Sequence, residues 1–161
     1  MITRLVPYES LNALQRQQVE AIEVHKEQIK FSGDIHGALH TVLSRPGPGV
    51  KGFALLADDI PVAFLLLKRP PVLPAWADEH SATLHALQVD QRHQGKGHGK
   101  ACLQALPEVA RQAFPEIRAL ELSVDADNEA AIALYARFGW VDSGEAYKGR
   151  IGHERRMGLI F

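Results

Sequence analysis

A glycine-rich run constrains this chain more than any other stretch of its sequence. Residues 94–100 read Gln-Gly-Lys-Gly-His-Gly-Lys, with three glycines in five residues, shortly after a β-prone segment over 82–89. The residues that follow favour a helix over about 97–113. A strand that enters such a loop and opens a helix aims backbone N–H groups and the positive helix end at one point, and glycine lets an anion approach the main chain closely. With Lys96 and Lys100 adding charge, the run predicts a site for a pyrophosphate group.

Two familiar phosphate-binding loops do not fit this run. In a P-loop the pair Gly99-Lys100 would be followed by serine or threonine, but residue 101 is alanine, and residue 94 is glutamine where a P-loop has glycine. In the dinucleotide-binding fingerprint the third glycine would fall at Lys100, and no strand–turn–helix unit opens the chain. The alternative interpretation is that the glycine run is a tight turn that binds no ligand.

The bulk composition predicts a single domain over residues 1–161. The 18 basic and 19 acidic side chains nearly balance, which gives no reason to expect nucleic acid or a membrane surface as a partner. The longest apolar run, over 61–67, is far too short to span a bilayer, and the first residues lack the pattern of a signal peptide. The single cysteine, Cys102, cannot form an internal disulfide and suits a reducing compartment. We therefore expect a cytoplasmic protein.

Hydrophobic periodicity and turn residues predict a mixed α/β sandwich, with helices on both sides of a central sheet. Pro107 lies inside the expected helix over 97–113 and predicts a kink or a break near 105–106. The expected elements, in chain order, are a strand at 2–6, helices at about 8–30 and 35–43, strands at 52–57, 62–67 and 82–89, the helix at 97–113, a strand at 118–124, a helix from Asp127 or Asn128 to Phe138, and strands at about 140–147 and 153–161.

A second motif lies in the predicted helix that ends at Phe138. Asn128 and Tyr135 stand seven residues apart, two turns along one helix face, and an aromatic residue follows the glycine after this helix. Each residue alone also fits a helix cap or a core side chain. Together with Gln94–Gly99, which matches the pattern Q/R-x-x-G-x-G/A, the motif resembles the GCN5-related N-acetyltransferase (GNAT) superfamily. The resemblance is close over about 82–139.

The resemblance implies a sheet whose fourth and fifth strands splay apart at a bulge, with acetyl-CoA lying in the resulting V. It also implies that Asn128 contacts the pantetheine arm and that Tyr135 lies at the thioester sulfur as the general acid. A main-chain N–H near Leu87 or Gln88 would stabilise the oxyanion. The residues implied to bind acetyl-CoA are Leu87, Gln88, Val89, Gln94, Gly95, Lys96, Gly97, His98, Gly99, Lys100 and Asn128.

The general base has to be sought outside the two motifs. Family members that acetylate protein N-termini carry a glutamate five residues before the asparagine, where this chain has Ser123, and Glu121 would lie ~7 Å away along the strand. His85 and Leu87 are two residues apart and therefore lie on the same face of the strand expected over 82–89. The ordinary pKa of an imidazole, near 6.5, suits a general base at neutral pH. Arylalkylamine acetyltransferases resemble this Leu-His-x-Leu segment. We expect His85 to be the base, with a structural histidine as the alternative, and Cys102 to be a core residue rather than a nucleophile.

The acceptor is expected to bind among the first two helices and the loops at 69–76 and 143–150. Acidic side chains there would attract a cationic amine and aromatic ones would wall the pocket, while a solvated acidic helix face is the alternative. No metal is expected, because His36 and His40 are spaced i, i+4 without a third ligand. The acceptor candidates are Glu20, Glu23, Glu27, Asp34, Trp76 and Tyr147.

These motifs together predict direct transfer of an acetyl group from acetyl-CoA to the primary amine of a small molecule in a ternary complex. Two alternatives stay open: a protein or peptide amine as the acceptor, and a non-catalytic sensor of acyl-CoA with the same fold. The apolar end of the strand over 155–161 also predicts that this strand pairs across a homodimer interface.

Overall fold

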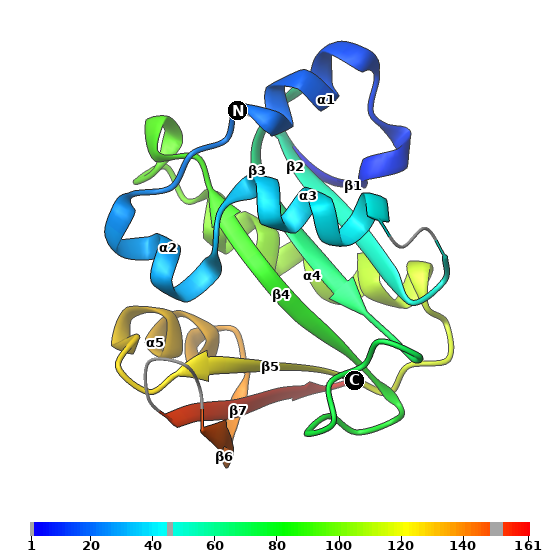
Figure 1. The fold of residues 1–161 in the computed structure, drawn as a ribbon, viewed down its shortest axis with the longest axis vertical. Coiled ribbons are helices and arrows are strands. Elements are labelled where there is room, and N and C mark those ends of the chain that lie inside the picture. The colour runs from blue at the N-terminus through cyan, green and yellow to red at the C-terminus, as the bar shows by residue number, and fades with distance from the viewer. Residues whose placement is uncertain (1, 45–46, 149–152) are drawn as a thin grey trace.

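A seven-stranded mixed sheet runs through the molecule (Figure 1). The computed structural model describes residues 2–44, 47–148 and 153–161, and for Ser32 and residues 145–148 it describes the backbone alone. The strand order is β1-β2-β3-β4-β5-β7-β6, and the parallel pair of this described sheet is β4 with β5. The strands are β1 Thr3–Pro7, β2 Val50–Ala57, β3 Ile60–Lys68, β4 Ser81–Val89, β5 Ala119–Asp125, β6 Val141–Lys148 and β7 His153–Ile160.

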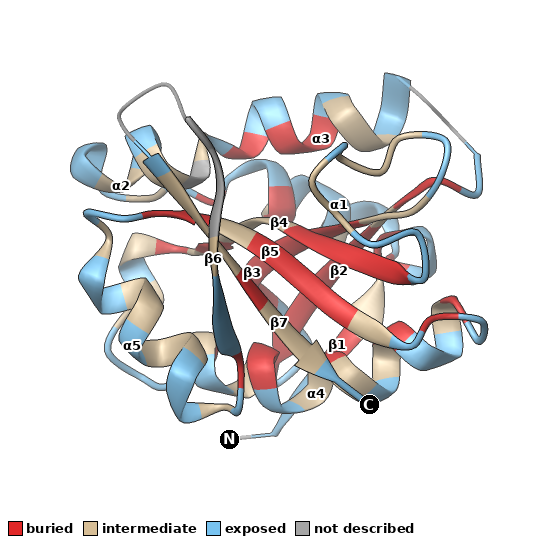
Figure 2. Cartoon of the chain, turned by 90° about the horizontal axis from the view of Figure 1, so that it is seen from below, coloured by how far each residue is buried: buried red, intermediate tan, exposed pale blue. Residues whose placement is uncertain are grey.

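Helices cover both faces of the sheet, as the sequence predicts (Figure 2). Side chains alternate along β2, so that Phe53 and Leu55 join the core shared with α4, while Ala54 and Leu56 join the core shared with α1 and α3. No helix of the described residues is long and apolar enough to cross a membrane. The helices are α1 Ala13–Glu20, α2 Lys26–Ser32, α3 Ile35–Ser44, α4 His98–Ala113 and α5 Glu129–Arg137, with short 3-10 turns at Tyr8–Ser10 and Gln91–His93.

The single helix expected over about 8–30 is wrong, because this stretch forms a 3-10 turn and two separate helices, α1 and α2. Between the helices, the main chain bonds to a distant segment. The Ala21 carbonyl accepts from the Arg92 guanidinium, and the Glu23 carbonyl accepts from the Gln91 N–H. Contacts with the loop after β4 therefore take up carbonyls of the expected helix, and local periodicity could not reveal them.

The sequence predicts a kink or a break near Pro107, and of these the break is wrong, because α4 continues through this residue to Ala113. Proline has no N–H to donate to the carbonyl four residues earlier, so one helical hydrogen bond is lost. The same turns bury Cys102, Leu103 and Leu106 against the sheet. Burying each such apolar side chain stabilises the helix by about 1.5–3 kcal/mol, which outweighs one net hydrogen bond of about 1 kcal/mol.

The C-terminal strand does not lie at an edge of the sheet. β7 pairs with β5 along its whole length, from Ile160 opposite Ala119 to Glu154 opposite Asp125, and its other edge pairs with β6. β6 bonds this second edge only as far as Gly158, beyond which the apolar end of β7 pairs with β5 alone. The expected pairing of the strand across a homodimer interface stays a prediction, confined to the β6-side edge of residues 159–161. The described sheet has β1 and β6 at its edges.

Candidate active site

β4 and β5 separate partway along their length, and this opening creates the site (Figure 1). The two strands pair at three positions only, the last being Thr83 opposite Glu121. Beyond it β4 carries a bulge. Its register against β3 shifts between His85 and Gln88, and Ala86 adopts a left-handed φ of 55°. The splayed fourth and fifth strands that the sequence predicts are confirmed, and the bulge centres on Ala86.

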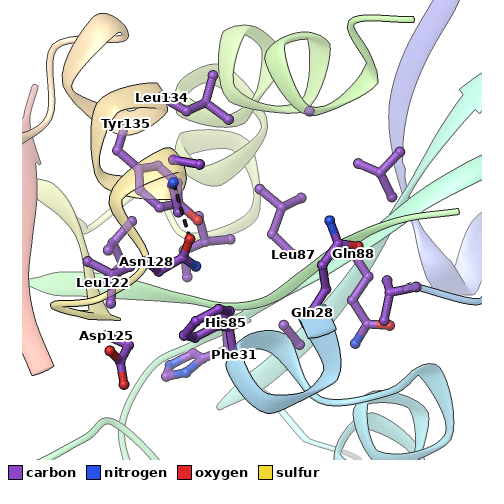
Figure 3. A pocket seen from close by; sticks show the side chains of 18 of the residues that line it. Gln28, Phe31, His85, Leu87, Gln88, Leu122, Asp125, Asn128, Leu134 and Tyr135 are labelled. Atoms are coloured by element: carbon purple, nitrogen blue, oxygen red, sulfur yellow. Dashed lines mark hydrogen bonds between the residues drawn. The ribbon is translucent and has the colours of Figure 1, made fainter. Parts of the chain in front are cut away.

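A cleft of about 730 Å³ fills the opening. Its walls come from α2 and the turn before it, from the second half of β4, from the glycine run, from β5, from the first two turns of α5, and from β7. Figure 3 shows side chains from these walls pointing into one space, with Asn128 and Tyr135 on the α5 side and Gln28 and Phe31 on the α2 side. The cleft therefore brings together segments from nearly the whole length of the chain.

The glycine run forms the wall at the start of α4. Gly95 and Gly97 have φ values of 79° and 82°, and Gly97 is the N-cap of the helix. No atom lies within 4 Å of where a Cβ would stand on either glycine, so the requirement for glycine is conformational and keeps the main chain open to a ligand. The expected binding residues Gly95, Gly97, His98, Gly99 and Lys100 line the cleft, whereas Lys96 is exposed and is not among the lining residues.

Two polar side chains of the run serve the protein itself. The Gln94 amide donates to the Val89 carbonyl at 2.9 Å and to Gln28 Oε1 at 3.0 Å, so it ties the loop to β4 and to α2. The His98 side chain is 2% exposed, and within the described residues its Nε2 has no hydrogen-bond partner. Burial, assisted by the charges of His93 and Lys96, lowers the pKa of His98 and keeps it neutral.

The second half of β4 forms the floor of the cleft. Leu87, Gln88 and Val89 all line it, as expected. Within the described sheet, β5 pairs with no residue of β4 beyond Thr83, so the sheet does not close that side of β4, although the Gln94 amide occupies the Val89 carbonyl.

Asn128 and Tyr135 both reach the cleft from α5, and both also have structural contacts. Asn128 is the N-cap, with its Oδ1 accepting from the Ala131 N–H at 3.3 Å (Figure 3). The Tyr135 ring packs 5.7 Å from that of Trp140. Burial, together with the adjacent Cys102, raises the pKa of Tyr135 to about 12, so its phenol keeps a proton that it can donate.

Cys102 is a core residue, as the sequence predicts. Its side chain is fully buried within the cluster between α4 and the sheet. Burial raises the pKa of the Cys102 thiol to about 12, so the reactive thiolate is absent at neutral pH.

His85 lies in the cleft, but its expected pKa near 6.5 is wrong. Its Nε2 is 2.7 Å from Thr83 Oγ1, which is fully buried. Burial, together with the positive charge of Lys68, lowers the pKa of His85 to about 3. The imidazole is therefore neutral throughout the physiological range and holds a proton only weakly.

Glu121 is committed elsewhere, so the structure removes it as a candidate base. One carboxylate oxygen accepts from the Asp78 N–H at 2.7 Å, and the other pairs with the Arg156 guanidinium. Ser123 does line the cleft.

The carboxylates that line the cleft belong to Glu27, Asp125 and Glu154. Sequence reasoning named only Glu27. Asp125 has the strand parity of Ser123, and this signal could have identified it. Glu154 enters because β7 pairs with β5 and places it opposite Asp125, a register that no local pattern reveals.

The other predicted acceptor residues are scattered. Glu20 and Glu23 are exposed and do not line the cleft, and Trp76 is half-buried away from it. Asp34 lines a second cavity of about 410 Å³, which shares His85 and Ala86 with the main cleft. The side chain of Tyr147 is outside the described residues. No group of three or more metal-ligating side chains occurs in the part of the chain that the structure describes.

Known proteins resemble this chain in both sequence and structure. A family model for the acetyltransferase (GNAT) family matches residues 11–140. The uncharacterized N-acetyltransferase YbbJ of Bacillus subtilis (strain 168) is 30% identical over 102 residues, which span 62% of this chain and 64% of that protein. The spermine/spermidine N(1)-acetyltransferase of the same organism is 40% identical over 57 residues, 35% of this chain and 37% of that protein. The chain thus spans less than two thirds of either relative.

A solved structure extends the likeness to the whole fold. The structure of AAC(6')-Ib in complex with paromomycin and acetyl-CoA matches with a TM-score of 0.75, covering 99% of this chain and 94% of that one. At 16% sequence identity, this likeness concerns the fold alone.

Proposed function

The chain belongs to the acetyltransferase (GNAT) family, and from this premise we propose that it transfers the acetyl group of acetyl-CoA to a primary amine of a small molecule. One observation carries the proposal: the splay of β4 and β5 holds the left-handed glycine run, the bulged strand and a protonated Tyr135 around one cleft. The glycine run suits the pyrophosphate of acetyl-CoA, the bulged strand suits its thioester, and Tyr135 suits the departing thiolate.

We place the acetyl-CoA along β4 and the start of α4. The backbone N–H groups of residues 95–100 and the positive end of α4 suit the pyrophosphate. Main-chain groups of residues 87–89, apart from the Val89 carbonyl that Gln94 holds, suit the amide groups of the pantetheine arm, because β5 has left that side of β4. Asn128 lines the path between these two regions and Tyr135. Lys100 adds a positive charge near the phosphates.

The proposed chemistry is direct attack of the amine on the thioester carbonyl. A main-chain N–H at the bulge, near Leu87 or Gln88, supplies a hydrogen bond to the oxyanion of the tetrahedral intermediate. When the carbon–sulfur bond breaks, Tyr135 donates its phenolic proton to the sulfur and recovers one from solvent. The attacking nitrogen gives up its extra proton as the amide forms.

With a pKa of about 3, His85 is a hydrogen-bond partner for the amine rather than the final holder of its proton. We propose that the proton leaves through water toward the cleft carboxylates Asp125 and Glu154. Family members that acetylate protein N-termini carry a glutamate at the position that Ser123 occupies here. The serine therefore gives no support to a peptide acceptor.

The acceptor we propose is a cationic small-molecule amine. Three carboxylates, those of Glu27, Asp125 and Glu154, line the cleft, against the two ammonium groups of Lys30 and Lys100. The names of two similar proteins point the same way, one acting on spermine and spermidine and one bound to paromomycin. A cytoplasmic location and a homodimer stay predictions, the second of which light scattering would measure.

The decisive experiment is release of free thiol from acetyl-CoA with a panel of polyamines, aminoglycosides, aryl amines, amino acids and peptides. Turnover with a small cationic amine, and its loss in Tyr135→Phe, is the expected result. A protein that binds CoA and releases no thiol with any amine would instead be the non-catalytic sensor. Turnover confined to peptides would reassign the acceptor class.

A further inference from the structure

Helix α2 has few contacts that hold it in place. It is seven residues long, and none of its described side chains is buried (Figure 2). Helices this short are unstable alone in water, and a segment with little buried surface opens at small cost in free energy. The position of α2 must therefore come from specific bonds to the rest of the molecule.

Those bonds come from the loop that leads into the glycine run. Gln94 Nε2 donates to Gln28 Oε1 of α2 at 3.0 Å, and the same amide group holds the Val89 carbonyl at 2.9 Å. Just upstream, the Gln91 N–H donates to the Glu23 carbonyl at 2.7 Å. The loop that precedes the proposed pyrophosphate site thus holds both α2 and the turn before it.

α2 also forms the wall of the cleft on the proposed acceptor side. Glu27, Lys30 and Phe31 line the cleft from this helix, as does Gln28 itself. In Figure 3, Gln28 and Phe31 project from α2 toward the space that His85 also faces. Whatever steadies α2 therefore steadies the surface that meets the amine.

We propose that the hydrogen bond between Gln94 and Gln28 couples the two substrate sites, so that CoA bound at the glycine run orders α2 as the acceptor wall. This inference rests on the proposed function. A ligand held by the N–H groups of residues 95–100 restricts the loop, and Gln94, which adjoins it, transmits the restriction through its amide. Because coupling between binding sites is reciprocal, an ordered α2 also favours CoA. Gln28 is a positioning residue in this scheme.

Hydrogen exchange of the backbone, with CoA as the probe, tests the coupling without knowledge of the acceptor. In the wild-type protein, saturating CoA should slow exchange over residues 95–100 and also over 26–32, the latter by up to about fivefold, because a link through one net hydrogen bond transmits no more than its own free energy. In Gln28→Ala the slowing over 26–32 should disappear, while that over 95–100 stays.

Gln28 Oε1 also accepts from the His25 N–H at 3.3 Å, in the capping box of α2, so Gln28→Ala removes two bonds. Gln94→Ala removes the donor to Gln28 and keeps this capping box, and it too should lose the slowing over 26–32. Two control variants complete the comparison. Gln28→Glu keeps an acceptor oxygen for the Gln94 amide and should retain the slowing of α2. Gln17→Ala removes the same kind of side chain from an exposed position on α1 and should behave as the wild type.

Three results would overturn the inference. Exchange over 26–32 that CoA does not change in the wild type would show that α2 is uncoupled from the glycine run. Equal slowing in Gln28→Ala would show that CoA acts on α2 without this hydrogen bond. No slowing over 95–100 in any variant would reject the CoA site itself, and the coupling with it, which distinguishes failure of the proposed function from failure of the link.

Discussion

The two walls of the cleft are built by different physical means. The wall from α4 stands on a buried apolar face, with Cys102, Leu103 and Leu106 packed against the sheet, and the binding groups of its glycine run belong to the main chain. The wall from α2 has no buried side chain among its described residues, and side-chain hydrogen bonds such as that of Gln28 hold it. Acetyl-CoA, which the whole family shares, suits a wall built from main-chain groups on a packed helix. In the α2 wall, a few side-chain substitutions can alter which acceptor binds without unfolding the core.

The largest expected effect concerns Tyr135 of α5. Tyr135→Phe keeps the ring and its packing on Trp140 but removes the phenolic proton. We expect kcat to fall by about 10²–10⁴-fold, the usual contribution of a general acid, with a nearly unchanged KM for acetyl-CoA. Steady-state kinetics with an accepted amine measure both constants. A full kcat in this variant would make Tyr135 a packing residue only.

The rise in melting temperature on ligand binding tests the proposed acetyl-CoA site as a whole. CoA binds the folded chain and not the unfolded one, so at 100 times its dissociation constant it should stabilise the protein by about 2.7 kcal/mol. Acetyl-CoA should do the same, and ATP or NAD at equal concentration should raise the melting temperature less. A larger shift with ATP than with CoA would contradict the assignment of the glycine run.

A substitution at Gly97 separates backbone strain from binding. Valine there would have to adopt a φ of 82°, which costs at least about 1–2 kcal/mol, and its side chain would stand where the pyrophosphate approaches. We expect CoA to bind at least tenfold more weakly, a loss of ~1.4 kcal/mol. Gly144→Val is the matched control, because Gly144 also has a positive φ and lies outside the cleft. It should lose stability and keep its CoA affinity, as calorimetry would show, and equal CoA affinity in both variants would argue against backbone binding.

The smallest expected effect is on the pH dependence of catalysis. Since the pKa of His85 is lowered to about 3, His85→Gln should leave any acidic limb of the pH–rate profile near pH 6.5 in place. Disappearance of such a limb in His85→Gln would restore His85 as a base with an ordinary pKa.

Stability should show the charge state of His85 more directly. The unfolded chain takes up a proton near pH 6.5, and the folded chain does so only near pH 3. The free energy of unfolding should therefore fall as the pH is lowered through this window, and fall less in His85→Gln. Chemical denaturation at pH 7 and pH 4.5 measures the difference.

Much of the nucleotide side of the site could be predicted from local sequence. Gly95 and Gly97 occupy left-handed backbone positions that other residues adopt only under strain. The conformation therefore requires glycine, and the glycines are visible in the sequence itself. The spacing of Asn128 and Tyr135 places both at the cleft because helix geometry is regular. Apart from the single helix expected over 8–30, the order of helices and strands likewise followed from periodicity and turn residues, and with it the mixed sheet with helices on both faces.

The remaining features depended on contacts between distant segments. Two carbonyls after α1 bond to residues 91 and 92, and this divides one periodic stretch into two helices. The pKa of His85 comes from burial and from Lys68 on the neighbouring strand, neither of which its own segment records. The pairing of β7 with β5 brings Arg156 within reach of Glu121 and Glu154 to the cleft beside Asp125. The sequence by itself therefore determined the backbone conformations that particular residue types require, and only the tertiary structure decided the charges and acceptor groups, because electrostatics and hydrogen bonding act through space rather than along the chain.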